Sequence, residues 1–371
     1  MLARIGAGGC GLDHPKDQKG RCVRAHAMQT DDVTEQQRGW VLAHDVRDRA
    51  GKRLLRKGGT LDADALCRWR DVAPGVVHML ELAADDVHED VAGLRIARAV
   101  SAPGIRTKGP IQSRYNLISE RKGLLRVDID ALRRVNTVDG VTVFSLLDRQ
   151  PVLPGKIVAG VKVTPIAIPS SQLAEVERIA SAGARPPLAV LPFVPKRAAV
   201  VATEGLSDVL RERFRSAVVR KLRWYGSELT DLRFVDSDAD AVARAFEGFL
   251  NAGADLLMAA GGNTIDPLDP IRMALTRIGA EMVHHGAPAH PGSMFWLARV
   301  GAVPIFNLAS CSMYSRATVA DLVLPLIMTG EHVASADIIE LGHGGLLERE
   351  MAFRFPDYDA ESSDEADTEG E

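Results

Sequence analysis

The sequence contains little cysteine, and its cysteines are not paired. Cys10, Cys22, Cys67 and Cys311 are the four cysteines among 371 residues, and no two of them form a Cys-x-x-Cys motif. This scatter argues against a disulfide framework and against a structural zinc site. It favours a reducing environment, and we therefore expect a cytoplasmic protein.

Long apolar runs are also missing. No stretch approaches the roughly 20 residues that a membrane-spanning helix needs. The first residues lack the cationic start and apolar core of a secretory signal, so we expect neither membrane insertion nor secretion. A net charge of −4 and a pI near 6.2 give no overall reason to expect a nucleic-acid or membrane-surface partner.

The length and the changes in pattern along the chain predict several parts. A chain of 371 residues is long enough for roughly two or three domains. We expect a polar disordered extension (1–37), a smaller N-terminal α/β or β-rich domain (38–169), a helix and Pro-rich linker (170–196), an α/β domain (197–345) and an acidic disordered tail (346–371).

From Arg197 onward, apolar strands and helical segments alternate strictly. The expected strands are Arg197–Ala202, Leu232–Val235, Asp255–Ala260 and Val303–Leu308, and the expected helices are Asp208–Trp224, Asp238–Asn251 and Pro270–Gly279. This alternation predicts the α/β class, with a parallel sheet between two helix layers in a three-layer arrangement. Ligands of such sheets bind at the carboxyl ends of the strands.

The most informative loop follows the expected strand Asp255–Ala260. It begins Gly261-Gly262-Asn263-Thr264 and leads into a helical segment at Pro270. Glycines let backbone N–H groups form a concave nest, and the following helix directs its unsatisfied N–H groups at the same point, which favours an anion. Asp266 and Asp269 would repel an anion unless a divalent cation bridges them, so the loop suggests a phosphate-bearing ligand together with Mg²⁺.

The same residues have an ordinary structural interpretation. Asp269 followed by Pro270 is a common helix start, with Asp as the N-cap and Pro at the first helical position. A Gly-Gly pair after a strand is frequent in α/β turns, and short glycine motifs are weak evidence alone. The position of the loop at the carboxyl end of a strand favours a binding site.

Two further segments complete a family pattern. Gly286–Gly292 reads Gly-x-Pro-x-x-Pro-Gly, and Pro304–Ser312 follows it. Together with Gly261–Thr264 and Asp269, these segments resemble the molybdopterin-binding (MoaB/Mog-type) domain shared by molybdopterin adenylyltransferases and molybdotransferases. The resemblance covers roughly 197–331 and extends more weakly over the preceding domain.

The resemblance implies that molybdopterin, or the molybdenum cofactor, is the ligand. It implies a catalytic role for Asp269, while metal binding by Asp266 and Asp269 is the expectation from the two carboxylates of the loop itself. The cofactor-binding residues that it implies are Gly261, Gly262, Asn263, Thr264, Pro291, Gly292, Ser293, Ser310, Cys311 and Ser312. Ser312 is equally interpretable as a helix cap, and Cys311 as a small buried apolar residue.

Departures from the family pattern affect catalysis more than binding. Asp266 stands where the family has glycine, and the loop Thr203-Glu204-Gly205 lacks one of the family's usual carboxylates. Leu308–Ser312 replaces a Leu-Pro-Gly-x-Pro loop.

Three functions remain open from the sequence. The first is a molybdopterin-binding protein of cofactor biosynthesis or delivery; if it is an enzyme, the resemblance favours transfer of molybdate to molybdopterin. The second is a non-catalytic carrier or insertion partner that serves a molybdoenzyme client. The third is a nucleotide-binding α/β enzyme. A homo-oligomer is compatible with all three.

Overall fold

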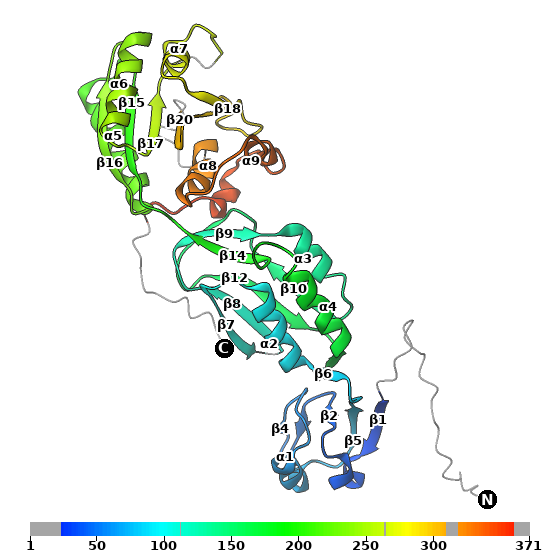
Figure 1. Cartoon of the computed structure of the whole chain (residues 1–371). Coiled ribbons are helices and arrows are strands. Elements are labelled where there is room, and N and C mark those ends of the chain that lie inside the picture. Colours follow the sequence, from blue (N-terminus) through cyan, green and yellow to red (C-terminus); the bar gives the residue numbers. More distant parts are fainter. Residues whose placement is uncertain (1–23, 112, 263–264, 309–317, 360–371) are drawn as a thin grey trace, which may run out of the picture.

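The computed structural model describes residues 24–111, 113–262, 265–308 and 318–359. It follows the chain from an N-terminal unit through a middle unit to a C-terminal unit (Figure 1). Helices and strands are mixed throughout, which confirms the α/β class in its general sense. None of the described helices is both long enough and apolar enough to cross a membrane.

The N-terminal unit is a small antiparallel sheet of order β1-β5-β2 beside the hairpin β3–β4 and one helix. Leu42, Leu61 and Met79 are fully buried in its core. Its elements are β1 (Arg24–Gln29), β2 (Val41–Leu42), β3 (Val46–Arg47), β4 (Arg53–Leu55), α1 (Ala63–Arg68) and β5 (Val76–Glu81).

The prediction of a disordered extension over 1–37 is wrong for its second part. Residues 24–37 form β1 and two short 3-10 helices, and β1 pairs with β5 along its whole length. This pairing supplies hydrogen-bond partners for the backbone that a polar strand on its own would lack. Residues 1–23 lie outside the described part of the chain.

The middle unit packs three helices on two sheets of order β10-β12-β8-β7 and β11-β9-β14. Its elements are β6 (Asp86–His88), α2 (Glu89–Val100), β7 (Ile105–Ile111), β8 (Arg114–Ser119), β9 (Gly123–Val127), α3 (Ile129–Val135), β10 (Val141–Ser145), β11 (Pro151–Val152), β12 (Ile157–Val163), β13 (Ala167–Pro169), α4 (Ser170–Ala180) and β14 (Leu188–Pro192).

The segment expected as a helix and linker belongs to this middle unit. Helix α4 is present, and its Leu173 and Val176 are buried in the core of the unit. Strand β14 then pairs with β9 over five residues. The Pro-rich composition around β14 concealed a strand whose Leu188–Val190 are buried.

The C-terminal unit contains a six-stranded sheet of order β16-β15-β17-β20-β19-β18. Apolar residues of α5 and α8 pack on one face of the sheet, and those of α6 and α7 pack on the other. Its elements are β15 (Arg197–Ala202), α5 (Asp208–Trp224), β16 (Glu228–Phe234), α6 (Ala239–Asn251), β17 (Leu256–Ala260), α7 (Pro270–Arg277), β18 (Glu281–His285), β19 (Trp296–Val300), β20 (Val303–Leu308), α8 (Val319–Met328) and α9 (Ser335–Ile339).

This sheet is mixed rather than wholly parallel. The strands β16, β15, β17 and β20 are parallel to one another. At one edge, β19 pairs antiparallel with β20, and β18 pairs antiparallel with β19. Every residue of β17 is buried, because helices cover both faces of the sheet there. The carboxyl ends of β15, β17 and β20 therefore meet at one edge, which is where the predicted site lies.

The prediction of a disordered tail from residue 346 is wrong for its first part. Residues 349–354 form a 3-10 helix, and Phe355 and Tyr358 are buried. The Tyr358 ring makes edge contacts with Trp224 and Tyr225 at the end of α5. Aromatic burial offsets the conformational entropy that a polar segment would lose on ordering. Residues 360–371 are not described.

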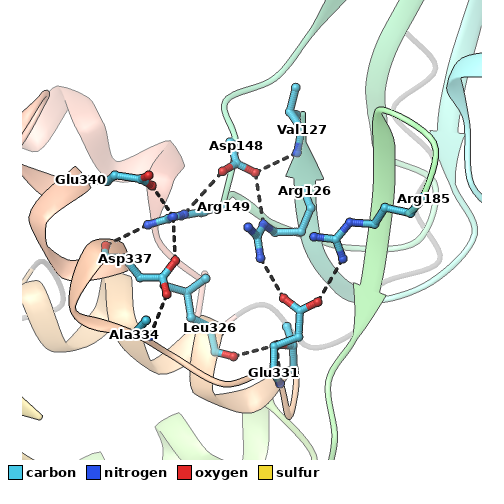
Figure 2. A network of polar contacts seen from close by, with 11 residues as sticks. Arg126, Val127, Asp148, Arg149, Arg185, Leu326, Glu331, Ala334, Asp337 and Glu340 are labelled. Carbon is cyan, nitrogen blue, oxygen red and sulfur yellow. Dashed lines mark hydrogen bonds and ion pairs between the residues drawn. The ribbon is translucent and has the colours of Figure 1, made fainter. Parts of the chain in front are cut away.

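A polar network joins the middle unit to the C-terminal unit (Figure 2). Arg149 Nη1 donates to the main-chain oxygen of Asp337 at 2.8 Å, and its Nη2 donates to Asp337 Oδ1 at 2.9 Å. Arg126 and Arg185 each bind one carboxylate oxygen of Glu331, at 2.8 and 3.0 Å. These contacts fix β9 and its neighbouring loops against the segment that follows α8.

Candidate functional site

Two consecutive glycines end the central strand β17 and adopt left-handed backbone conformations. The φ angles are +94° at Gly261 and +83° at Gly262. A Cβ atom on Gly261 would lie 2.6 Å from Thr203 Oγ1 and 2.9 Å from Glu204 Cγ. Glycine is needed at Gly261 for two reasons. Other residues rarely adopt this backbone conformation, and the loop after β15 approaches too closely to leave room for a side chain.

Gly262 faces the carboxylate of Asp269 across the start of α7. A Cβ on Gly262 would lie 2.9 Å from Asp269 Oδ2. Asp269 is 7% exposed, and its Oδ1 accepts hydrogen bonds from the backbone N–H groups of Ile271 at 2.9 Å and Arg272 at 3.3 Å. With Pro270 at the first helical position, the helix-start interpretation of Asp269 is confirmed.

Asp266 also binds backbone rather than approaching Asp269 in a metal cluster. Its exposed side chain accepts a hydrogen bond from the Leu268 N–H at 2.8 Å. Within the described part of the chain, no group of three or more His, Cys, Asp or Glu side chains is arranged to hold a metal ion. The expected metal role of Asp266 and Asp269 therefore gains no support from their geometry.

A small hollow lies between the glycine pair and the edge strands. Its volume is only about 10 Å³, and the residues that line it are Gly261, Gly262, Asp269, Ile271, Arg272, Leu275, Met282, His285 and Trp296. Pockets for whole organic ligands are about 300–1,000 Å³. The hollow holds about one water molecule, so a terminal group such as a phosphate would lie at its mouth rather than inside it. Arg272 and His285 are the basic residues of its lining.

The turn between β18 and β19 holds the second predicted segment. Gly292 has φ +112°, and a Cβ there would lie 2.9 Å from the Val319 nitrogen. The Val319 N–H donates to the Pro291 oxygen at 3.3 Å, and the Ser293 oxygen accepts from Ala287 at 2.9 Å. Pro291 and Gly292 therefore pack against the start of α8, and Ser293 closes the turn.

Asn307 on β20 is a residue that the sequence interpretation missed. It is 4% exposed; its Oδ1 accepts from the Trp296 N–H at 2.7 Å, and its Nδ2 donates to the Met294 oxygen at 3.0 Å. Asn307 thus fixes the end of the turn next to β20. A polar residue within an otherwise apolar strand was the signal that could have identified it.

The described structure brings together part of the predicted site. Gly261, Gly262 and Asp269 share the hollow, while Pro291, Gly292 and Ser293 lie in the turn between its wall residues His285 and Trp296. Arg272, His285 and Trp296 were not predicted. Five predicted residues lie outside the described residues: Asn263, Thr264, Ser310, Cys311 and Ser312.

Comparison with known proteins gives only weak similarities. No family model matches the chain, and no curated protein matches it. The solved structures that it resembles include a molybdopterin biosynthesis MoeA protein from Pyrococcus horikosii, with 13% identity, a TM-score of 0.28 and coverage of 68% of this chain and 81% of that one.

Two other solved structures are similarly distant. A MogA structure has 19% identity and a TM-score of 0.24, covering 35% of this chain and 90% of that one. A NadC deletion mutant has 16% identity and a TM-score of 0.16, covering 44% and 68%. Scores this low carry no argument about function, which must come from the residues of the site.

Proposed function

We propose that this chain binds molybdopterin or the molybdenum cofactor, and acts in the biosynthesis or delivery of that cofactor. The observation that carries the proposal is the pair Gly261–Gly262, which is enclosed by Thr203 and Glu204 on one side and by Asp269 on the other. The motif resemblance supplies the ligand class, and we assign its terminal phosphate to the glycine pair at the mouth of the hollow.

The surroundings of the hollow suit a phosphate. The N-terminus of α7 carries partial positive charge, and Arg272 is one of the residues that line the hollow. An arginine guanidinium can bind two phosphate oxygens at once. The Asp269 carboxylate, which opposes an anion, already accepts two backbone hydrogen bonds that disperse its charge.

Titration with purified molybdopterin, followed by pterin fluorescence or calorimetry, tests the proposal. Gly262→Ala is expected to weaken binding at least about tenfold, equivalent to about 1.4 kcal/mol. The added Cβ would push the loop away from Asp269 and change the shape of the nest.

Gly279→Ala is the matched control. Gly279 also has a left-handed backbone, with φ +68°, but nothing lies within 4 Å of the position of its Cβ. Both substitutions carry a backbone strain of about 1–2 kcal/mol, so the control separates lost stability from lost binding. Equal affinities of the two variants, or no binding by the unmodified protein, would contradict the assignment.

The geometry gives particular support to the carrier function among the alternatives. Both candidate carboxylates, Asp266 and Asp269, are used as local backbone acceptors. A carrier would bind the cofactor but would not turn over adenylylated molybdopterin in the presence of molybdate. Release of AMP in that assay would instead identify a transferase, and affinity for nucleotides without affinity for pterins would identify a nucleotide-binding enzyme.

A further inference from the structure

A second hollow, the amino-edge hollow, lies at the edge of the C-terminal sheet opposite to the glycine pair. Lys196 directly precedes β15, and Pro304 stands near the start of β20, so this hollow is at the amino ends of the parallel strands. The glycine pair instead follows the carboxyl end of β17. The amino-edge hollow has a volume of about 230 Å³. Pockets for drug-sized ligands measure roughly 300–1,000 Å³, so this one suits a smaller organic molecule.

Two cations in the lining have no acidic partner. Lys196 and Arg299 both line the amino-edge hollow and are partly buried, and neither forms an ion pair within the described part of the chain. Arg299 Nη1 contacts the ring nitrogen Nδ1 of His332, which also lines the hollow. An imidazole nitrogen can accept a hydrogen bond from a guanidinium, but it does not neutralise the guanidinium charge. Two positive charges therefore remain available to a ligand.

The nearby acids do not cancel this charge. Among the described residues of the lining, Glu331 is the one acid, and its two carboxylate oxygens bind Arg126 and Arg185 at 2.8 and 3.0 Å. These two arginines are not part of the described lining. Glu281, another described residue, lies opposite Arg299 in the strand register, and the two form no ion pair. The amino-edge hollow therefore has an excess of positive charge, which favours an anion.

The rest of the lining is mainly apolar. Val283 and Pro304 are partly exposed and Ala302 is exposed, so their apolar surface is accessible to a ligand. Leu297 and Ile327 also line the hollow and are buried in the core of the unit. A hydrated inorganic anion would leave the accessible carbon atoms in contact with water, whereas an organic anion would cover them. The lining thus favours an anion that has an apolar body.

We propose that the amino-edge hollow binds a small organic carboxylate with a branched apolar body. The carboxylate would lie on Arg299, because a planar guanidinium can donate two parallel hydrogen bonds to it. Lys196 would supply the second cation, and the apolar body would cover Val283 and Pro304. This site is separate from the glycine pair, and it does not depend on the ligand assigned there.

The position of the hollow gives its ligand a structural effect. Glu331 and His332 belong to the segment after α8, which Arg126 and Arg185 of the middle unit hold. A carboxylate bound to Arg299 beside His332 would fasten this segment to the edge strands. Because a ligand that binds only the folded protein stabilises it, a suitable carboxylate should raise the Tm of the full chain.

Titration of the full chain with isovalerate, observed by the NMR signals of the ligand, tests the assignment. Binding is expected to saturate with a Kd on the order of 1 mM, as suits so small a ligand. Isoamyl alcohol has the same branched body without the charge, and inorganic phosphate has charge without the body. Each should be at least about tenfold weaker in displacing isovalerate. Absence of saturable isovalerate binding, or equal displacement by phosphate, would overturn the proposal.

Variants of the full chain locate the binding. Arg299→Gln is expected to weaken isovalerate binding at least about tenfold, and Arg299→Lys, which keeps the charge but loses the planar fork, should weaken it less. Arg244→Gln is the matched control, because Arg244 is exposed on α6, whose apolar residues pack on the other face of the sheet. Equal affinities of Arg299→Gln and Arg244→Gln would contradict the site.

The Gly262→Ala variant separates this proposal from the proposed function. It alters the loop at the opposite edge of the sheet, so it should bind isovalerate as the unmodified protein does. Loss of isovalerate binding in Gly262→Ala would show that the carboxylate occupies the glycine pair instead of the amino-edge hollow. Failure to bind molybdopterin would leave all of these isovalerate results unchanged.

Discussion

Glu89 is a buried acid at the junction of the N-terminal and middle units. It is 4% exposed, and a Cβ on Gly58 would lie 2.5 Å from its Oε1. The neighbouring His88 places Nε2 2.7 Å from the Gly58 oxygen. Burial raises the pKa of Glu89, and a hydrogen bond from Ser113 offsets only part of that effect.

Stability should depend on the charge of Glu89. Because its pKa is higher in the folded protein, the folded state binds the proton more tightly than the unfolded state does. The stabilisation by the protonated acid is complete below the unfolded pKa, near 4.5, and is lost as pH rises through the folded pKa. Each unit of difference corresponds to about 1.4 kcal/mol.

Glu89→Gln is therefore expected to make the protein more stable than the unmodified chain at neutral pH. The amide keeps the shape of the side chain without its charge, and the advantage should vanish near pH 4. Urea unfolding between pH 4 and 8 measures this difference. Glu247→Gln, at an exposed position on α6, should change little at any pH, and a similar response from both variants would refute the role of burial.

At the scale of elements, the antiparallel edge of the sheet depends on one buried amide. Asn307 on β20 binds the backbone at both Met294 and Trp296, where the turn enters β19. Leaving the buried Trp296 N–H without a partner costs about 1–3 kcal/mol, and losing the partly buried bond to the Met294 oxygen adds about 1 kcal/mol.

Asn307→Ala is accordingly expected to destabilise the protein by about 2–4 kcal/mol, as measured by chemical denaturation. Asn251→Ala provides a control, because Asn251 is an exposed residue at the end of α6 and should lose less than about 0.5 kcal/mol. A loss of the same small size at Asn307 would show that the turn holds its position without the amide.

The sequence predicted elements best where the pattern is local. The alternation of β15 to α7 was evident, because buried strands such as β17 are wholly apolar and helices such as α6 begin with a capping aspartate. Strand β18 was missed, because Glu281–His285 has no apolar alternation and is ordered by pairing with β19. Pairing partners distant in sequence decide such strands.

The residues of the candidate site show the same difference between local patterns and contacts distant in sequence. Gly261 and Gly262 were predicted, since a glycine pair after an apolar strand is a local signal. Arg272 and Trp296 were not predicted. Arg272 lines the hollow because of the direction in which α7 runs, and Trp296 lines it because β18 and β19 form a hairpin. Tyr358 was missed because it stands among acidic residues in the sequence, although it is buried and its hydroxyl donates to Asp321.

At the scale of the whole molecule, the middle and C-terminal units are coupled through partly buried charges (Figure 2). Arg149 is 15% exposed and pairs with both Asp337 and Glu340, while Asp148 contacts Arg126 and Arg149 from the same unit. The neighbouring Lys122 lies 3.9 Å from the centre of the Trp224 ring, which adds an apolar and cation–π contact. The interface is therefore expected to keep the two units together during thermal unfolding.

Arg149→Met should weaken this coupling, because it keeps the apolar length of the side chain and removes both guanidinium donors to Asp337. Since Glu340 is 65% exposed and Asp337 is 23% exposed, water will compensate part of the lost pairing. We expect a loss of about 1–3 kcal/mol, between the values for exposed and buried pairs, and a broader or divided calorimetric transition. Arg178→Met removes the exposed pair with Glu175 and should barely change stability, because water screens that pair. If Arg149→Met costs no more than this control and leaves one sharp transition, the network does not couple the units.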